Sequence, residues 1–117
     1  MSARRASGAV GARALHGSVA VFAALGDETR LELVAKLSGG RPQSIVQLTA
    51  GRAVTRQAIT KHLRVLEGAG LVRGIRRGRE TLFALEPKPL DEARRSLDRI
   101  ARQWDLALAR LKSLVES

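Results

Sequence analysis

The stretch SIVQLTAGRAVTRQAITKHLRVLEGAG, residues 44–70, decides the fold. Its first part places Ile45 and Leu48 three residues apart and then reaches Gly51, which is typical of a short helix that ends in a turn. Its second part begins at Thr55, a residue type that caps helix N-termini, and continues with an apolar stripe at spacings of four and three. This stripe consists of Ile59, Leu63 and Leu66. We therefore predict two short helices joined by a tight turn.

The face of the second helix opposite the apolar stripe is polar and cationic. At 100° per residue, this face and the start of the helix collect side chains that can donate hydrogen bonds. They are Thr55, Arg56, Gln57, Thr60, Lys61 and Arg64. An α-helix fits the major groove of B-DNA, where Gln pairs with adenine, Arg or Lys with guanine, and Thr with bases or phosphates. We therefore predict a helix-turn-helix whose second helix reads duplex DNA, the alternative being a basic face that is merely solvated.

A basic hairpin is expected after the second helix. Residues 71–75 and 80–85 both alternate apolar and polar positions, as in short strands. Three arginines lie at or next to the connecting turn: Arg76, Arg77 and Arg79. Gly78 supplies the backbone conformation that a tight turn needs. Such a wing can follow the phosphate backbone or enter the minor groove; the alternative is a hairpin made soluble by its arginines.

The charge balance favours a polyanionic partner. The 117 residues include 21 Lys and Arg against 11 Asp and Glu, a formal net charge of +10. Only three aromatic residues are present, too few for the stacking platforms that bind single strands; they are Phe22, Phe83 and Trp104. No apolar run approaches the roughly 18 to 20 residues of a membrane-spanning helix. Duplex DNA is therefore the expected partner, with no membrane association.

Catalysis and cofactors are not expected. The chain contains no cysteine, so it has no disulfide framework, no thiolate metal site and no Cys nucleophile. We find no Ser/His/Asp set, no glycine-rich phosphate loop after a strand and no clustered carboxylate-histidine site. We therefore predict that the chain is not an enzyme and uses no cofactor or metal.

The length is typical of one domain, preceded by a tail. Residues 1–17 are rich in Ala, Gly, Ser and Arg, so we expect a flexible basic tail there, with no ligand role for His16. Ser18 is expected to cap a helix, and Asp27 the next one. The first helix carries Val21, Phe22 and Leu25, and the second is expected to place Leu31, Val34 and Leu37 on its inner face. The domain is thus expected over residues 18–117.

A long helix over residues 90–116 is predicted to form the dimer interface. From Leu90 its apolar residues recur at spacings of three and four. About 25 helical residues extend roughly 37 Å, more than a small domain needs to cover its core. The surplus stripe therefore favours a second copy of the chain, with Trp104 as its anchor; the alternative is a helix that folds back onto its own core. The expected interface residues are Phe22, Leu97, Ile100, Trp104, Leu108 and Leu111.

Three runs of residues together resemble one known family. They are FAALGDETRL (22–31), TRQAITKHL (55–63), and VL (65–66) followed by GLV (70–72). This set resembles the ArsR-type winged helix-turn-helix repressors over roughly residues 19 to 116. The resemblance implies a homodimer that binds a near-palindromic operator and represses, often its own operon. It also implies DNA contacts from the recognition helix and wing residues given above, and a structural role for His62.

The chain departs from the metal-sensing members of that family. Where those proteins carry a Cys-x-Cys pair, this chain has Ser44, Ile45 and Val46, none of which offers a thiolate. The family's other site pairs Asp and His on the last helix, but here no His follows His62. The carboxylates of that helix, Asp91, Glu92, Asp98 and Asp105, are expected to be solvated. We therefore expect no metal regulation, and the inducing signal stays open.

Together these features predict a mainly α fold with a small β-hairpin, of the winged helix-turn-helix kind. The favoured function is sequence-specific binding of duplex DNA by a homodimeric repressor, in the cytoplasm on the nucleoid. Two other functions stay open: a sequence-neutral architectural DNA-binding protein, and a winged-helix module that binds proteins.

Overall fold

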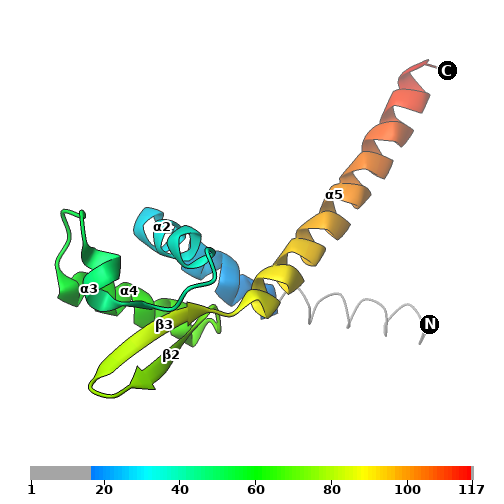
Figure 1. The fold of residues 1–117 in the computed structure, drawn as a ribbon. Coiled ribbons are helices and arrows are strands. Elements are labelled where there is room, and N and C mark those ends of the chain that lie inside the picture. The colour runs from blue at the N-terminus through cyan, green and yellow to red at the C-terminus, as the bar shows by residue number, and fades with distance from the viewer. Residues whose placement is uncertain (1–16, 117) are drawn as a thin grey trace.

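The computed structural model describes residues 17–116, which form several helices and a small antiparallel sheet at the edge of the molecule (Figure 1). In chain order the elements are a helix over residues 17–25, α2 (Glu28–Leu37), β1 (Gln43–Ser44), α3 (Ile45–Thr49), α4 (Arg56–Gly68), β2 (Val72–Arg77), β3 (Glu80–Leu85) and α5 (Pro87–Glu116). The predicted fold class, mainly α with a small β part, is confirmed.

Asp27 and Thr55 cap the helices that the sequence predicts for them, and Ser44 caps α3. The Asp27 carboxylate accepts a hydrogen bond of 3.0 Å from the Arg30 amide at the start of α2. Ser44 and Gln47 cap α3 reciprocally, each side chain accepting from the other residue's backbone N–H. The Thr55 hydroxyl accepts from the Ala58 amide at 3.1 Å and so starts α4. Each cap satisfies an amide that a helix N-terminus leaves without a partner.

The core joins α2, α3 and α4 to the start of the hairpin. Its most deeply buried apolar side chains are Leu33, Leu37, Leu48, Ile59, Leu63, Leu66 and Leu71. The predicted stripe of α4 is therefore confirmed, but the assignment of Leu31 to the inner face of α2 is wrong, because Leu31 is 53% exposed and Leu33 is buried instead. A stripe through Leu31 and one through Leu33 can both include Val34 and Leu37, so the spacing alone does not distinguish them.

The sheet has three strands in the order β1-β3-β2, all antiparallel. The predicted hairpin is present and pairs Val72 with Leu85 and Arg77 with Glu80. Gly78 opens the two-residue turn with a φ of +60°, a conformation that glycine adopts without strain. The third strand, β1, was not predicted, because two residues are too few to show a period.

The helix over residues 17–25 packs on the first part of α5. Val21 and Ala24 are buried, and the Ser18 hydroxyl lies 3.3 Å from that of Ser96 in α5. The helix already includes Gly17, so Ser18 lies inside it, and its prediction as a cap is wrong. The tail predicted over residues 1–17 lies outside the described residues except for Gly17, and His16 lies outside them too.

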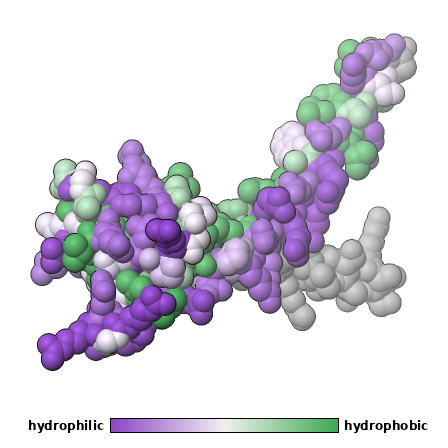
Figure 2. All heavy atoms as spheres, viewed as in Figure 1, coloured by the Kyte–Doolittle hydropathy of each residue, from purple (hydrophilic) through white to green (hydrophobic). Residues whose placement is uncertain are grey.

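Helix α5 leaves the rest of the molecule and projects from it (Figure 1). It has 30 residues and begins at Pro87, three residues before the predicted start, because proline is tolerated in the first turn of a helix. Only Ala93 and Ser96 are buried in it. Its first turns contribute Leu90 and Ala93 to the core, but the rest of the helix does not fold back onto that core. Its outer part shows apolar side chains at the surface (Figure 2).

Candidate nucleic-acid interface

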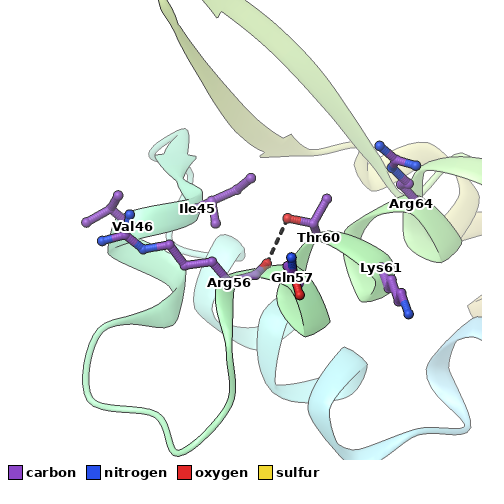
Figure 3. A pocket seen from close by; sticks show the side chains of 7 residues that line it. All are labelled: Ile45, Val46, Arg56, Gln57, Thr60, Lys61 and Arg64. Carbon is purple, nitrogen blue, oxygen red and sulfur yellow. Dashed lines mark hydrogen bonds between the residues drawn. The ribbon is translucent and has the colours of Figure 1, made fainter.

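A groove of about 660 Å³ runs between α3 and α4 on the surface of the helix-turn-helix. Its lining residues are Ile45, Val46, Arg56, Gln57, Thr60, Lys61 and Arg64 (Figure 3). Five of the six side chains predicted for the recognition helix thus lie in one groove. The sixth, Thr55, is exposed at the start of α4 and caps that helix. The two apolar residues of α3 that line it, Ile45 and Val46, were not predicted from the sequence as part of this surface.

The groove is held by contacts behind and beside it. Leu48 of α3 packs with Ile59 and Leu63 of α4 in the common core. The Lys36 ammonium of α2 donates to the Gln47 carbonyl of α3 at 2.9 Å. In the loop between α3 and α4, Arg52 forms an ion pair of 2.8 Å with Glu32 of α2. The relative position of α3 and α4 is therefore fixed through α2.

Thr60 is less available for base contacts than the sequence indicates. Its hydroxyl donates to the Arg56 carbonyl at 2.8 Å, within the helix (Figure 3). Such a bond within the helix occupies the only hydroxyl proton. Thr60 therefore presents to the groove a methyl group and an oxygen that can accept a hydrogen bond but has no proton left to donate.

The groove is positively charged. Three of its seven lining residues, Arg56, Lys61 and Arg64, are cations, and none is a carboxylate. Among the described residues, none of these three cations forms an ion pair. Lys61 and Arg64 are three residues apart on α4, and their side chains point in different directions (Figure 3). Because no ion pair neutralises these cations, the groove attracts polyanions and repels other cations.

The wing carries the predicted arginines at its tip. Arg77, Gly78 and Arg79 are exposed there, and the tip is strongly hydrophilic (Figure 2). Arg76 turns back and donates through Nε to the Gly78 carbonyl at 3.1 Å, which supports the turn. Of the described arginines in the hairpin, only Arg73 forms an ion pair, at 2.6 Å with Glu86, next to the ends of the strands away from the tip. Arg77 and Arg79 are thus free to meet phosphates.

A polar cluster lies behind the recognition helix. The Arg30 guanidinium donates to the carbonyls of Ala24 at 2.6 Å and Ala23 at 3.4 Å, at the end of the helix over residues 17–25. The same guanidinium lies 3.4 Å from Nδ1 of His62, which is 3.7 Å from the Asp27 carboxylate. His62 therefore contacts neighbouring helices and does not line the groove.

The pKa of Asp27 is lowered from its ordinary value of 3.8. The largest cause is the hydrogen bond from the Arg30 backbone amide, followed by partial burial, which acts in the opposite direction. The charges of Arg30 and His62 add to the lowering. The carboxylate is thus held in its charged form, in which it caps α2.

Neither a metal site nor a membrane-spanning segment appears in the described part of the chain. No three His, Asp or Glu side chains of residues 17–116 gather closely enough to hold a metal ion. None of the described helices is both long and apolar enough to cross a bilayer.

A capped recognition helix, a supporting helix and an arginine-tipped hairpin define a winged helix-turn-helix DNA-binding regulator. The family described as "Helix-turn-helix domain" matches residues 25–75. The HTH-type transcriptional regulator Rv2034 of Mycobacterium tuberculosis is 35% identical over 94 residues, which cover 80% of this chain and 84% of that protein. YuzN of Bacillus subtilis, named as an HTH-type transcriptional regulator, is 40% identical over 77 residues, 61% of this chain and 84% of that protein.

Comparison with solved structures identifies the family to which the chain belongs. An ArsR-like transcriptional regulator from Rhodococcus sp. RHA1 is 40% identical and superposes with a TM-score of 0.74, covering 86% of this chain and 93% of its own. A winged helix-turn-helix domain of Mycobacterium bovis, 22% identical with a TM-score of 0.61 over 81% of this chain and 86% of its own, shares the fold. The chain belongs to the ArsR family of transcriptional regulators. It is a DNA-binding regulator rather than an enzyme.

Proposed function

We propose that this chain is a homodimeric repressor that binds an operator with inverted half-sites. The single observation that carries the proposal is the division of the molecule into two ends (Figure 1). One end presents the cationic groove and the arginine-tipped wing. The other end is a long helix whose apolar stripe is left exposed by the rest of the described residues. The first suits DNA, and the second suits another subunit.

The apolar stripe of α5 supports the dimer. Its 30 residues extend about 45 Å, and most of its large apolar side chains are exposed. The stripe includes most of the interface residues expected from the sequence: Leu97, Ile100, Trp104, Leu108 and Leu111. Phe22, the remaining one, is half-buried against the core. Contiguous exposed apolar surface of this kind marks interaction sites, and the Mycobacterium bovis domain of the same fold is homodimeric.

Symmetry then determines the form of the target. Two recognition helices related by a two-fold axis can enter successive major grooves about 34 Å apart. In this arrangement Arg56, Gln57, Lys61 and Arg64 would face base edges and nearby phosphates, while Arg77 and Arg79 of each wing would reach the flanking backbone. The operator is therefore expected to carry inverted half-sites about one helical turn apart.

Repression requires only that the bound dimer occupy its DNA. The DNA-binding surface of the groove and wing and the apolar stripe of α5 are sufficient for this. Such a regulator would act on the nucleoid in the cytoplasm. No metal is assigned as its effector, because the chain contains no thiolate and the described carboxylates do not cluster.

The test is selection from a pool of random DNA duplexes by the purified full chain, followed by sequencing and footprinting. We expect enrichment of an inverted repeat, protected over both half-sites, and the same motif in DNA upstream of the regulated genes. Retention of DNA without enrichment of any motif would instead indicate an architectural coating protein. Failure to retain DNA at low salt would indicate a protein-interaction module.

A further inference from the structure

The groove between α3 and α4 contains apolar surface that phosphate binding does not explain. Val46 is the second residue of α3, the first helix of the helix-turn-helix, and is 54% exposed. Ile45 precedes it and lines the same groove. Thr60 faces them from α4 with its hydroxyl bonded to its own helix, so that its methyl group is left for contacts. We call these three residues the apolar strip.

The apolar strip lies beside polar side chains that suit base edges. Arg56 and Gln57 line the same groove (Figure 3), and within the described residues Arg56 makes no ion pair. Side chains of these two types form paired hydrogen bonds with guanine and adenine in the major groove. A surface that combines such donors with an apolar patch matches a base step in which a purine edge adjoins a methyl group.

Thymine is the base that presents a methyl group in the major groove of ordinary DNA. The 5-methyl group projects into the groove and distinguishes T·A from C·G by apolar contact alone. The positive charge of the groove, from Arg56, Lys61 and Arg64, is complementary to the backbone of a duplex and disfavours an apolar protein segment as occupant. The occupant that fits both properties is therefore a duplex with a thymine at this position.

We propose that Val46, supported by Ile45 and Thr60, reads the 5-methyl group of a thymine in each half-site. The proposal rests on the proposed function and deepens it, because it assigns a specificity-determining residue to α3, the helix before the recognition helix. Val46 covers the methyl group and removes it from water, while Arg56 and Gln57 bind the neighbouring purine. The wing and the remaining cations supply affinity that does not depend on this base.

The experiment uses deoxyuridine, which lacks the 5-methyl group of thymidine and keeps its hydrogen-bonding edge. Each thymine of the duplex selected by the full-length protein is replaced in turn, and the dissociation constant is measured at fixed salt. We expect at least one thymine in each half-site at which the replacement weakens wild-type binding about fourfold, the effect of one methyl group left in water. The other thymines should be insensitive.

Two variants locate the effect. Val46→Ala shortens an exposed side chain and should bind the thymine and deoxyuridine duplexes equally. Val65→Ala is the matched control, because Val65 is also an exposed valine but does not line the groove. It should retain the wild-type difference between the two duplexes.

Each result has one meaning. A selected duplex in which no thymine is sensitive to deoxyuridine overturns the methyl-reading proposal and leaves the proposed function intact. Sensitivity that persists in Val46→Ala also overturns it, since another residue must then read the methyl group. Failure to select any duplex contradicts the proposed function itself.

Discussion

Gln57 and Arg77 are expected to contribute to DNA binding in different ways. Gln57 lies in the groove and Arg77 at the wing tip, so the first is placed for bases and the second for phosphates. We predict that Gln57→Ala costs about 1 to 3 kcal/mol on the operator and little on random DNA. Arg77→Ala should weaken both complexes and reduce the salt dependence of binding. Titrations of both DNAs measure this, and equal losses on both for Gln57→Ala would remove Gln57 from the base-reading residues.

Asp27 makes stability depend on pH. Because its pKa in the folded chain lies below its ordinary value of 3.8, the charged carboxylate stabilises the fold above that pH. This contribution is lost as the pH falls through the folded pKa. Asp27→Asn keeps a side chain that can cap α2 but does not titrate.

We therefore predict that wild type exceeds Asp27→Asn in free energy of unfolding near neutral pH and that this advantage shrinks below pH 3.8. Urea unfolding of both proteins over a series of pH values measures the difference. An advantage that stayed constant down to about pH 3 would show that the charge of Asp27 has no role.

At the scale of single residues, the sequence predicted those positions whose partners are close in the chain. Thr55 and Asp27 cap helices by contacting amides three residues ahead, so a local pattern was sufficient. The contact between Arg30 and His62 spans 32 residues and could not be found in that way. For the same reason Val46 was not recognised as part of the groove, since its place depends on how α3 meets α4.

At the scale of elements, the wing depends on the conformation of its turn. Gly78 has a φ of +60°, and nothing lies within 4 Å of where a Cβ would stand. The cost of replacing it therefore comes from the backbone alone. We predict that Gly78→Ala lowers the free energy of unfolding by about 1 kcal/mol.

Gly68 provides the matched control for that change. It is the last residue of α4, has an ordinary helical φ, and also has open space around a Cβ. Gly68→Ala should raise the free energy of unfolding by about 0.5 to 1 kcal/mol, because alanine restricts the unfolded chain more. Urea unfolding of both variants tests the pair, and a shift in the same direction for both would contradict the role given to the turn.

Helix α5 and strand β1 show where prediction of elements succeeds and fails. The long, regular apolar stripe of α5 identified the helix, and only its start was misplaced, by three residues at Pro87. Strand β1 exists because Gln43 and Ser44 pair with Phe83 and Leu82 of β3. Two residues are too few to show a strand period, so β1 is defined only by its pairing with β3, which is distant in the sequence.

At the scale of the whole molecule, dimerisation and DNA binding are expected to be coupled. Trp104 is 64% exposed in the single chain, in the middle of the apolar stripe of α5. Tryptophan at an interface is often worth about 2 kcal/mol or more. We predict that Trp104→Ala raises the dimer dissociation constant about 30-fold or more and lowers operator affinity with it.

Sedimentation at several protein concentrations, together with DNA titration, measures both effects. Arg102→Ala is a suitable control, because Arg102 lies on the opposite face of α5 and is also exposed. It should leave the dimer unchanged. A wild-type chain that sediments as a monomer and still binds its operator fully would rule out the coupling.

The most direct test of the account compares two duplexes of equal length and base composition at one salt concentration. One carries the inverted repeat selected by the protein, and the other the same bases scrambled. The groove and wing predict tighter binding to the first by at least about a thousandfold, the margin typical of specific regulators. Equal affinity for the two duplexes would contradict the claim that the groove and wing bind a specific DNA sequence.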